Sequence, residues 1–138
     1  MIEMKAKVFF LSILMAVSAA VFAQDNQNIE FVERVHDFGQ IQEDGGRVTT
    51  TFEFTNTSKK PVTLDNVQAS CGCTTPQWSK EAIAPKKKGF INVTYNPAGR
   101  PGSFTKSITV KYHDASEETK TIVLNIKGEV IPKAKPAN

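Results

Sequence analysis

The chain has 138 residues, of which 17 are Lys or Arg and 14 are Asp or Glu, and it carries a formal net charge of +3. A length in this range suits one domain, which buries on the order of two thirds of its unfolded surface. The weak net charge argues against nucleic acid or an anionic membrane surface as a partner.

The first segment has the pattern of an export signal. Lys5 and Lys7 precede an apolar run over residues 8–17, and Val21-Phe22-Ala23 satisfies the small-residue rule for cleavage after Ala23. The apolar run is too short to cross a bilayer comfortably, which disfavours the alternative of an uncleaved anchor. Residues 1–23 are therefore predicted to be a cleaved signal peptide. We expect a periplasmic or secreted protein without a membrane span after cleavage.

Alternation of apolar and polar residues dominates the rest of the chain and predicts β-strands. It is clearest at residues 48–55, 62–64, 91–95, 104–112 and 122–128. Residues 29–38 are apolar but irregular, which is typical of an edge strand or a strand that changes sheets. Turn-forming residues such as Asn56-Thr57-Ser58, which also match a glycosylation sequon, separate the strands.

About seven short strands, each with one buried face, predict an all-β fold, an immunoglobulin-like antiparallel β-sandwich. The predicted domain covers residues 24–130. The tail, residues 131–138, offers little apolar surface to bury and is predicted to be disordered.

Several motifs in this chain, in this order, resemble those of a known family. Among them are Asp37-Phe38-Gly39-Gln40-Ile41, Ser70-Cys71-Gly72-Cys73-Thr74-Thr75-Pro76, Ile83-Ala84-Pro85 and Val93-Thr94-Tyr95-Asn96-Pro97. Over about residues 31–130 the chain resembles the bacterial domain-of-unknown-function family numbered fifteen-seventy-three, common in Bacteroidetes envelopes. It is similar in fold to Hydin-like and major-sperm-protein-like immunoglobulin domains. The resemblance implies this fold and an envelope location, but no activity. One departure is Lys86-Lys87-Lys88-Gly89, where the family usually follows Pro85 with glycine.

Cys71 and Cys73 are the only cysteines and the one place where the sequence suggests chemistry. In an extended segment their side chains would share a face, with Cα atoms near the upper limit for a disulfide. Gly72 lacks a Cβ and can adopt the dihedrals that such a small ring demands. A strained bridge is more easily reduced, which would suit a redox role. The alternative is an inert bridge or two semi-buried thiols, since reactivity needs exposure and a lowered pKa.

The same pair is a weak candidate for metal binding. Two cysteines supply half of the four ligands that structural zinc usually takes, and His36 and His113 lie far from them in sequence. Linear coordination of Cu(I) by the Cys71 and Cys73 thiolates stays open, because soft thiolates favour that ion. No cofactor is expected.

Trp78 follows the cysteines closely and has two readings. It is an exposed anchor for a partner, because tryptophan is enriched at binding hot spots, or it covers one end of the core, because it buries a large area.

No nucleophile elbow, zinc-protease motif or phosphate-binding glycine loop occurs, so an enzyme is not expected. The sequence instead predicts a non-catalytic interaction module of the bacterial envelope. Its unidentified protein partner would bind a free sheet edge, or the loop end that bears Cys71, Cys73 and Trp78. The alternative function is a thiol-redox or copper-binding protein that uses Cys71 and Cys73. The sequence gives no oligomeric state.

Overall fold

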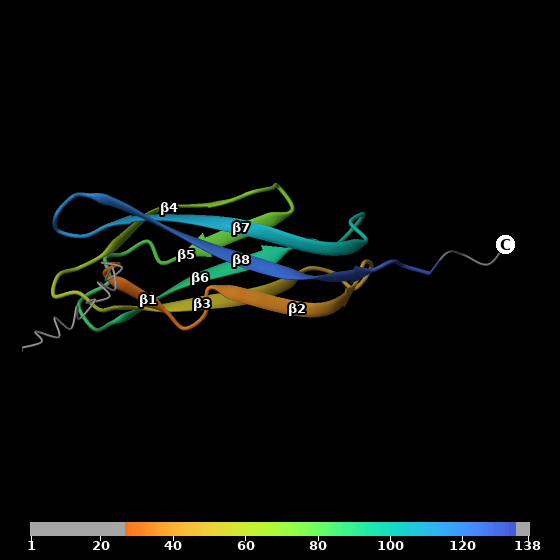
Figure 1. Cartoon of the computed structure of the whole chain (residues 1–138), viewed down its shortest axis with the longest axis horizontal. Helices are drawn as coiled ribbons and strands as arrows, with labels where there is room; N and C mark the ends of the chain where they lie inside the picture. Colours follow the sequence, from red (N-terminus) through yellow and green to blue (C-terminus); the bar gives the residue numbers. More distant parts are fainter. Residues whose placement is uncertain (1–26, 135–138) are drawn as a thin grey trace, which may run out of the picture.

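The computed structural model describes residues 27–134 and shows two packed four-stranded sheets (Figure 1). The strands are β1 (Ile29–Phe31), β2 (Val35–Gln42), β3 (Val48–Asn56), β4 (Thr63–Ala69), β5 (Thr74–Trp78), β6 (Lys88–Tyr95), β7 (Gly102–His113) and β8 (Thr119–Ile131). The strand order is β1-β3-β6-β5 in the first sheet and β2-β8-β7-β4 in the second. The predicted all-β sandwich is confirmed.

The predicted signal peptide and residues 135–138 of the predicted tail lie outside the described residues. The last strand, β8, ends at Ile131, one residue beyond the predicted domain boundary. Within residues 27–134 no helix has the length and apolar character needed to cross a membrane.

The structure has eight strands where about seven were predicted. The irregular apolar segment at 29–38 divides into β1 and β2, which lie in different sheets, as expected of a chain that changes sheets. The strand that the sequence did not predict is β5. It follows a turn and contains Pro76, which masks the alternation of residues, and it lies at a sheet edge, where a residue without an N–H is tolerated.

One strand pair runs parallel, although an antiparallel sandwich was predicted. β2 pairs with β8 in parallel, and its register shifts between Asp37 and Gln40, where Gly39 has a φ of 66°. The link at residues 32–34 carries the chain from one sheet to the other without reversing it, so β2 continues in the direction of β1 (Figure 1). The strand then meets β8, which runs the same way.

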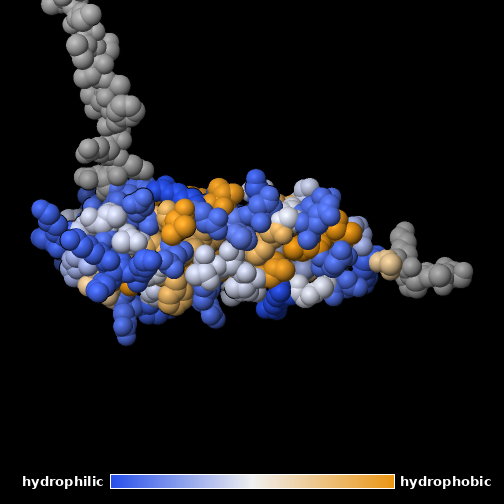
Figure 2. All heavy atoms as spheres, turned by 90° about the horizontal axis from the view of Figure 1, so that it is seen from below, coloured by the Kyte–Doolittle hydropathy of each residue, from blue (hydrophilic) through white to orange (hydrophobic). Residues whose placement is uncertain are grey.

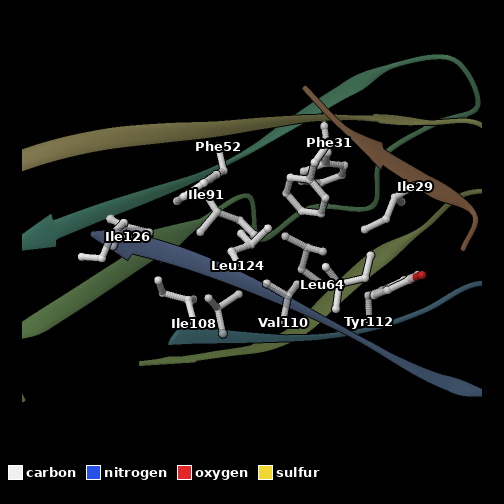
Figure 3. Packing of buried hydrophobic residues seen from close by; sticks show 14 of the residues in the cluster. Ile29, Phe31, Phe52, Leu64, Ile91, Ile108, Val110, Tyr112, Leu124 and Ile126 are labelled. Atoms are coloured by element: carbon white, nitrogen blue, oxygen red, sulfur yellow. The ribbon is translucent and has the colours of Figure 1, made fainter. Parts of the chain in front are cut away.

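The core lies between the sheets and is built from alternate residues of the strands. In Figure 3, Phe52 and Ile91 of the first sheet project toward Leu124 and Ile108 of the second. The residues below 2% exposure include Phe52, Phe54, Ile91, Tyr95, Ile108, Tyr112, Leu124 and Ile126. The alternation had placed all of them on buried faces, because each strand covers the core with one side only.

The departure from the family pattern falls in the turn before β6. The Lys87 N–H donates to the Ala84 carbonyl over 3.0 Å, so that Pro85 and Lys86 are the two central residues of the turn. Lys86 has a φ of 63°. Proline followed by a residue of positive φ is the arrangement of a type II turn, which favours glycine at its third position. A lysine therefore occupies a glycine position.

We expect Lys86→Gly to raise the free energy of unfolding by about 0.5–1 kcal/mol. The left-handed conformation costs a non-glycine residue about 1–2 kcal/mol, and the greater freedom of glycine in the unfolded chain offsets part of the gain. Urea unfolding measures the effect. Lys87→Gly is the control, because the φ of Lys87 is not positive and the change should lower stability. Equal losses in the two variants would contradict the assignment of this turn.

Candidate functional site

The candidate site is the cysteine loop, defined as residues 70–73 between β4 and β5. A disulfide joins Cys71 to Cys73, with the two Cα atoms 5.3 Å apart. The segment is turned rather than extended, and the Thr74 N–H approaches the Cys71 carbonyl at 3.4 Å. The Cα separation therefore falls inside the usual range for a disulfide and not near its upper limit. Gly72 does not adopt a positive φ, and a Cβ added there would meet no heavy atom within 4 Å.

Both ends of the cysteine loop are held by the sheets. On the β4 side, the Ser70 N–H donates to the Ser107 carbonyl over 2.9 Å, and the Ser107 N–H donates to the Ser70 hydroxyl over 3.2 Å. On the β5 side, the Asn96 N–H donates to the Cys73 carbonyl over 2.9 Å. The loop bridges the two sheets and is anchored in each of them.

The two sulfurs have different surroundings. Cys73 is 6% exposed and belongs to the core, whereas Cys71 is partly buried and packs against the core from outside. The Thr74 hydroxyl lies 3.7 Å from the Cys71 sulfur and 3.6 Å from the Cys73 sulfur, within reach of a weak hydrogen bond to either. Thr74 is itself only 4% exposed, so water competes little for its hydroxyl.

A small hollow opens beside Cys73. It has a volume of about 40 Å³, room for about one water molecule. Its lining residues are Arg47, Gly72, Cys73, Thr75, Thr94 and Asn96. Arg47, an exposed residue, is the one charged side chain in this lining. Sequence reasoning identified neither Thr74 nor Arg47. The position of Thr74 directly after Cys73 was a usable signal, but nothing in the sequence connects Arg47 with the cysteines.

Trp78 lies at the far end of β5 from the cysteine loop. Four residues along a strand span about 13 Å, so Trp78 and the cysteines do not form one loop end, and that expectation was wrong. The indole packs partly against the core, and the Lys80 ammonium lies 3.1 Å from its ring centroid. Trp78 also lines a separate groove of about 430 Å³ together with Ile83 and the half-exposed Phe90.

The histidines lie apart from the cysteine loop and are paired with carboxylates. His36 Nδ1 lies 2.9 Å from Glu33, and His113 Nδ1 lies 2.6 Å from Asp65. Across residues 27–134, no three His, Cys, Asp or Glu side chains gather in a group that could hold a metal ion. A copper ion between Cys71 and Cys73 would require the disulfide to be reduced first.

The four edge strands differ in how readily their backbones could pair with a further strand. In the first sheet, β1 has three residues and β5 contains Pro76. In the second sheet, β2 is interrupted near its middle by the register shift at Gly39, whereas the shift in β4 falls near its start and leaves Asn66–Ala69 regular. Within the described chain, β4 pairs only with β7, and it leads directly into the cysteine loop (Figure 1).

The face shown in Figure 2 has no broad apolar patch that could serve as a binding surface instead of a sheet edge. Hydrophobic side chains form separate small patches there among hydrophilic ones. Among residues 27–134 the large hydrophobic residues that are exposed are Val32, Val35, Phe90 and Val123. Val35 on β2 and Val123 on β8 belong to neighbouring strands, Val32 precedes β2, and Phe90 lies on β6 of the other sheet.

The sequence matches one family model, and the fold is similar to that of several solved structures. A family model described as a protein of unknown function, DUF1573, matches residues 29–130. No curated protein matches the sequence.

Three solved structures share the fold. The PapD-like domain 7 of human CEP192 has a TM-score of 0.65 at 12% identity, and the match covers 78% of this chain and 87% of that one. WR4, a C. elegans member of the major sperm protein family, has a TM-score of 0.52 at 14% identity, covering 75% and 97%. The Vibrio cholerae VesB protease has a TM-score of 0.63 at 15% identity, and the 75% of this chain that matches spans only 32% of the protease.

Proposed function

This chain belongs to the DUF1573 family of proteins of unknown function, and we propose that it is an exported, non-catalytic interaction module of the bacterial cell envelope. The proposed binding mode is addition of an extended segment of another exported protein to the free edge of β4. The single observation that carries the proposal is the unprotected β4 edge beside the cysteine loop.

The composition of β4 supports this choice of edge. Natural edge strands are commonly protected by lysine, proline or a bulge, because their unpaired N–H and C=O groups invite a further strand. β4 contains neither lysine nor proline, and its one acidic side chain, Asp65, is paired with His113. Its one register shift lies near its start, between Leu64 and Asn66, and leaves the rest of the edge unprotected. An incoming strand would therefore meet regular backbone from Asn66 to Ala69 without a charge to bury.

Export and the absence of catalysis are supported by the sequence. The signal pattern at residues 1–23 would deliver the chain to the periplasm or beyond it. The neighbours of known structure are less than 25% identical, so they support the fold alone, and the protease activity of VesB does not transfer to this chain. A PapD-like sandwich without a catalytic motif is best suited to binding another polypeptide.

A proline substitution at the free edge tests the proposal. The Ser70 N–H bonds to β7, and because alternate residues of an antiparallel strand face opposite sides, the Ala69 N–H points away from β7. Ala69→Pro should therefore block strand addition and leave the β4–β7 ladder intact. The control is Gln68→Ala, which removes an exposed side chain and keeps every backbone N–H.

The measurement is quantitative cross-linking from an envelope fraction, combined with hydrogen exchange of the bait. The original chain and Gln68→Ala should recover the same partner, and Ala69→Pro should recover at least about tenfold less, a loss of about 1.4 kcal/mol of binding energy. The amides of Val67 and Ala69 should become protected in the complex. Equal recovery by all three baits, or protection at β2 instead of β4, would overturn the proposal.

A further inference from the structure

We propose that the Cys71–Cys73 disulfide is a thiol–disulfide exchange site that oxidises a dithiol in another exported protein, with Cys71 as the sulfur attacked and Cys73 as the leaving thiolate. Three features of the cysteine loop point to this chemistry: the two cysteines differ in burial, a buried hydroxyl lies within reach of both sulfurs, and both ends of the loop are anchored in the sheets. The inference does not depend on strand addition at β4.

Accessibility assigns the direction of attack. An incoming thiolate must approach one sulfur along the S–S axis from the side opposite to the other sulfur, so the sulfur that is attacked has to face solvent. Cys73 is 6% exposed and lies in the core, whereas Cys71 lies at the outer margin of the core. Only attack at Cys71 leaves the packed side of the loop undisturbed.

The Thr74 hydroxyl lies at nearly the same distance from both sulfurs and can stabilise a thiolate on either, so it is the burial of Cys73 that assigns it the role of leaving group. A thiolate released there would lie 3.6 Å from the Thr74 hydroxyl, which can turn its hydrogen toward the sulfur. Arg47 lines the hollow beside Cys73. A hydrogen-bond donor favours the charged form of a thiol and offsets part of the cost of burying that charge at Cys73, and a thiolate with a lowered pKa leaves faster.

The reaction balances with one partner. A thiolate of the partner dithiol attacks the Cys71 sulfur, a mixed disulfide forms, the Cys71–Cys73 bond breaks, and its electron pair goes to Cys73. The second thiolate of the partner then attacks the partner's first sulfur in the mixed disulfide. This closes the partner's disulfide and releases Cys71 as a thiolate. The partner loses two electrons and two protons and gains a disulfide, and Cys71 and Cys73 become thiols. The anchors at Ser107 and Asn96 hold the loop throughout.

The first test asks whether the native bridge exchanges at all, and through which sulfur. The oxidised mature chain is treated with dithiothreitol without denaturant, and thiols are counted by alkylation and intact mass. Two thiols should appear while the protein stays folded. Cys73→Ser and Cys71→Ser, each with one thiol left, are then treated with oxidised glutathione. Cys71 should form the mixed disulfide at least about tenfold faster than Cys73. Reduction only in denaturant, or equal rates at the two positions, would overturn the proposal.

The second test concerns Thr74 as a positioning residue. Thr74→Val keeps the shape of the side chain and removes the hydroxyl. It should slow native reduction several-fold, and in the Cys71→Ser background it should raise the pKa of the Cys73 thiol in the pH profile of alkylation. Thr74→Ser should restore both values. Thr121→Val, at an exposed position on β8, is the control and should change neither. An unchanged pH profile in a folded Thr74→Val protein would contradict the role of the hydroxyl.

Discussion

Replacing Asn56 with alanine is expected to lower the free energy of unfolding by about 3–5 kcal/mol. The Asn56 side chain is completely buried at the end of β3. Its amide nitrogen donates to the carbonyls of Lys60 and Ile83, each over 2.8 Å. Its oxygen accepts from the Ser58 N–H over 2.9 Å and from the Ser58 hydroxyl over 2.7 Å. Every hydrogen-bonding position of the amide is used, so truncation strands several polar groups at once.

Urea unfolding measures this loss, and Asn92→Ala is the matched control. Asn92 points outward from β6, where its oxygen accepts from the Thr51 hydroxyl over 2.7 Å at an exposed position. Water can replace that bond, so Asn92→Ala should cost no more than about 1 kcal/mol. Similar losses at both positions would contradict the idea that Asn56 organises the two loops that it joins.

The same geometry changes the meaning of the sequon at residues 56–58. Attachment of a glycan requires the Asn56 amide nitrogen to be reachable, and in the folded chain both of its hydrogens are donated to buried or partly buried carbonyls. The motif is therefore a structural turn in which the asparagine side chain binds Ser58 two residues later.

The strands that face the core with one side were readable from the sequence because burial itself imposes a period of two. Phe52 and Phe54 on β3, and Ile122, Leu124 and Ile126 on β8, are buried as the alternation predicted. Alternation does not reveal a strand whose position depends on something other than the burial of one face. β5 owes its position to pairing with β6 and to the loop that precedes it, and its pattern is broken by Pro76.

The parallel pair was unreadable for a different reason. Strand direction depends on where the chain goes after leaving a sheet, and the link at residues 32–34 carries no mark of a crossover rather than a reversal. Local composition reports a turn or a strand, but not which sheet receives the next strand.

The candidate site, too, was predictable from the sequence only in part. The cysteine pair was evident, because two cysteines one residue apart in a chain predicted to be exported have few roles. The unequal exposure of the two cysteines could not be predicted, because it depends on which sulfur the sheets cover. Arg47 reaches the hollow beside Cys73 from a loop 24 residues upstream of Cys71. The separation of Trp78 from the cysteines follows from β5, the strand that the sequence did not reveal.

Gly89→Ala is expected to lower the free energy of unfolding by about 2–3 kcal/mol. This glycine lies within β6 opposite Phe54. A Cβ at this position would overlap the Phe54 ring, reaching Cζ and lying 2.8 and 2.9 Å from the two Cε atoms. Phe54 is completely buried and cannot swing away into solvent. The glycine therefore makes room for a core side chain.

Urea unfolding of a double-mutant cycle separates this cause from a general weakness of β6. Phe54→Leu removes the ring that the new methyl group meets, so Gly89→Ala should cost clearly less in that background than in the original chain, a coupling of about 1 kcal/mol or more. Gly72→Ala is the control and should be close to neutral, because its added Cβ meets nothing within 4 Å. Strictly additive losses would mean that the ring does not require the glycine. Coupled losses would show that the Phe54 ring, and with it the packing of the core, requires a glycine at this position of β6.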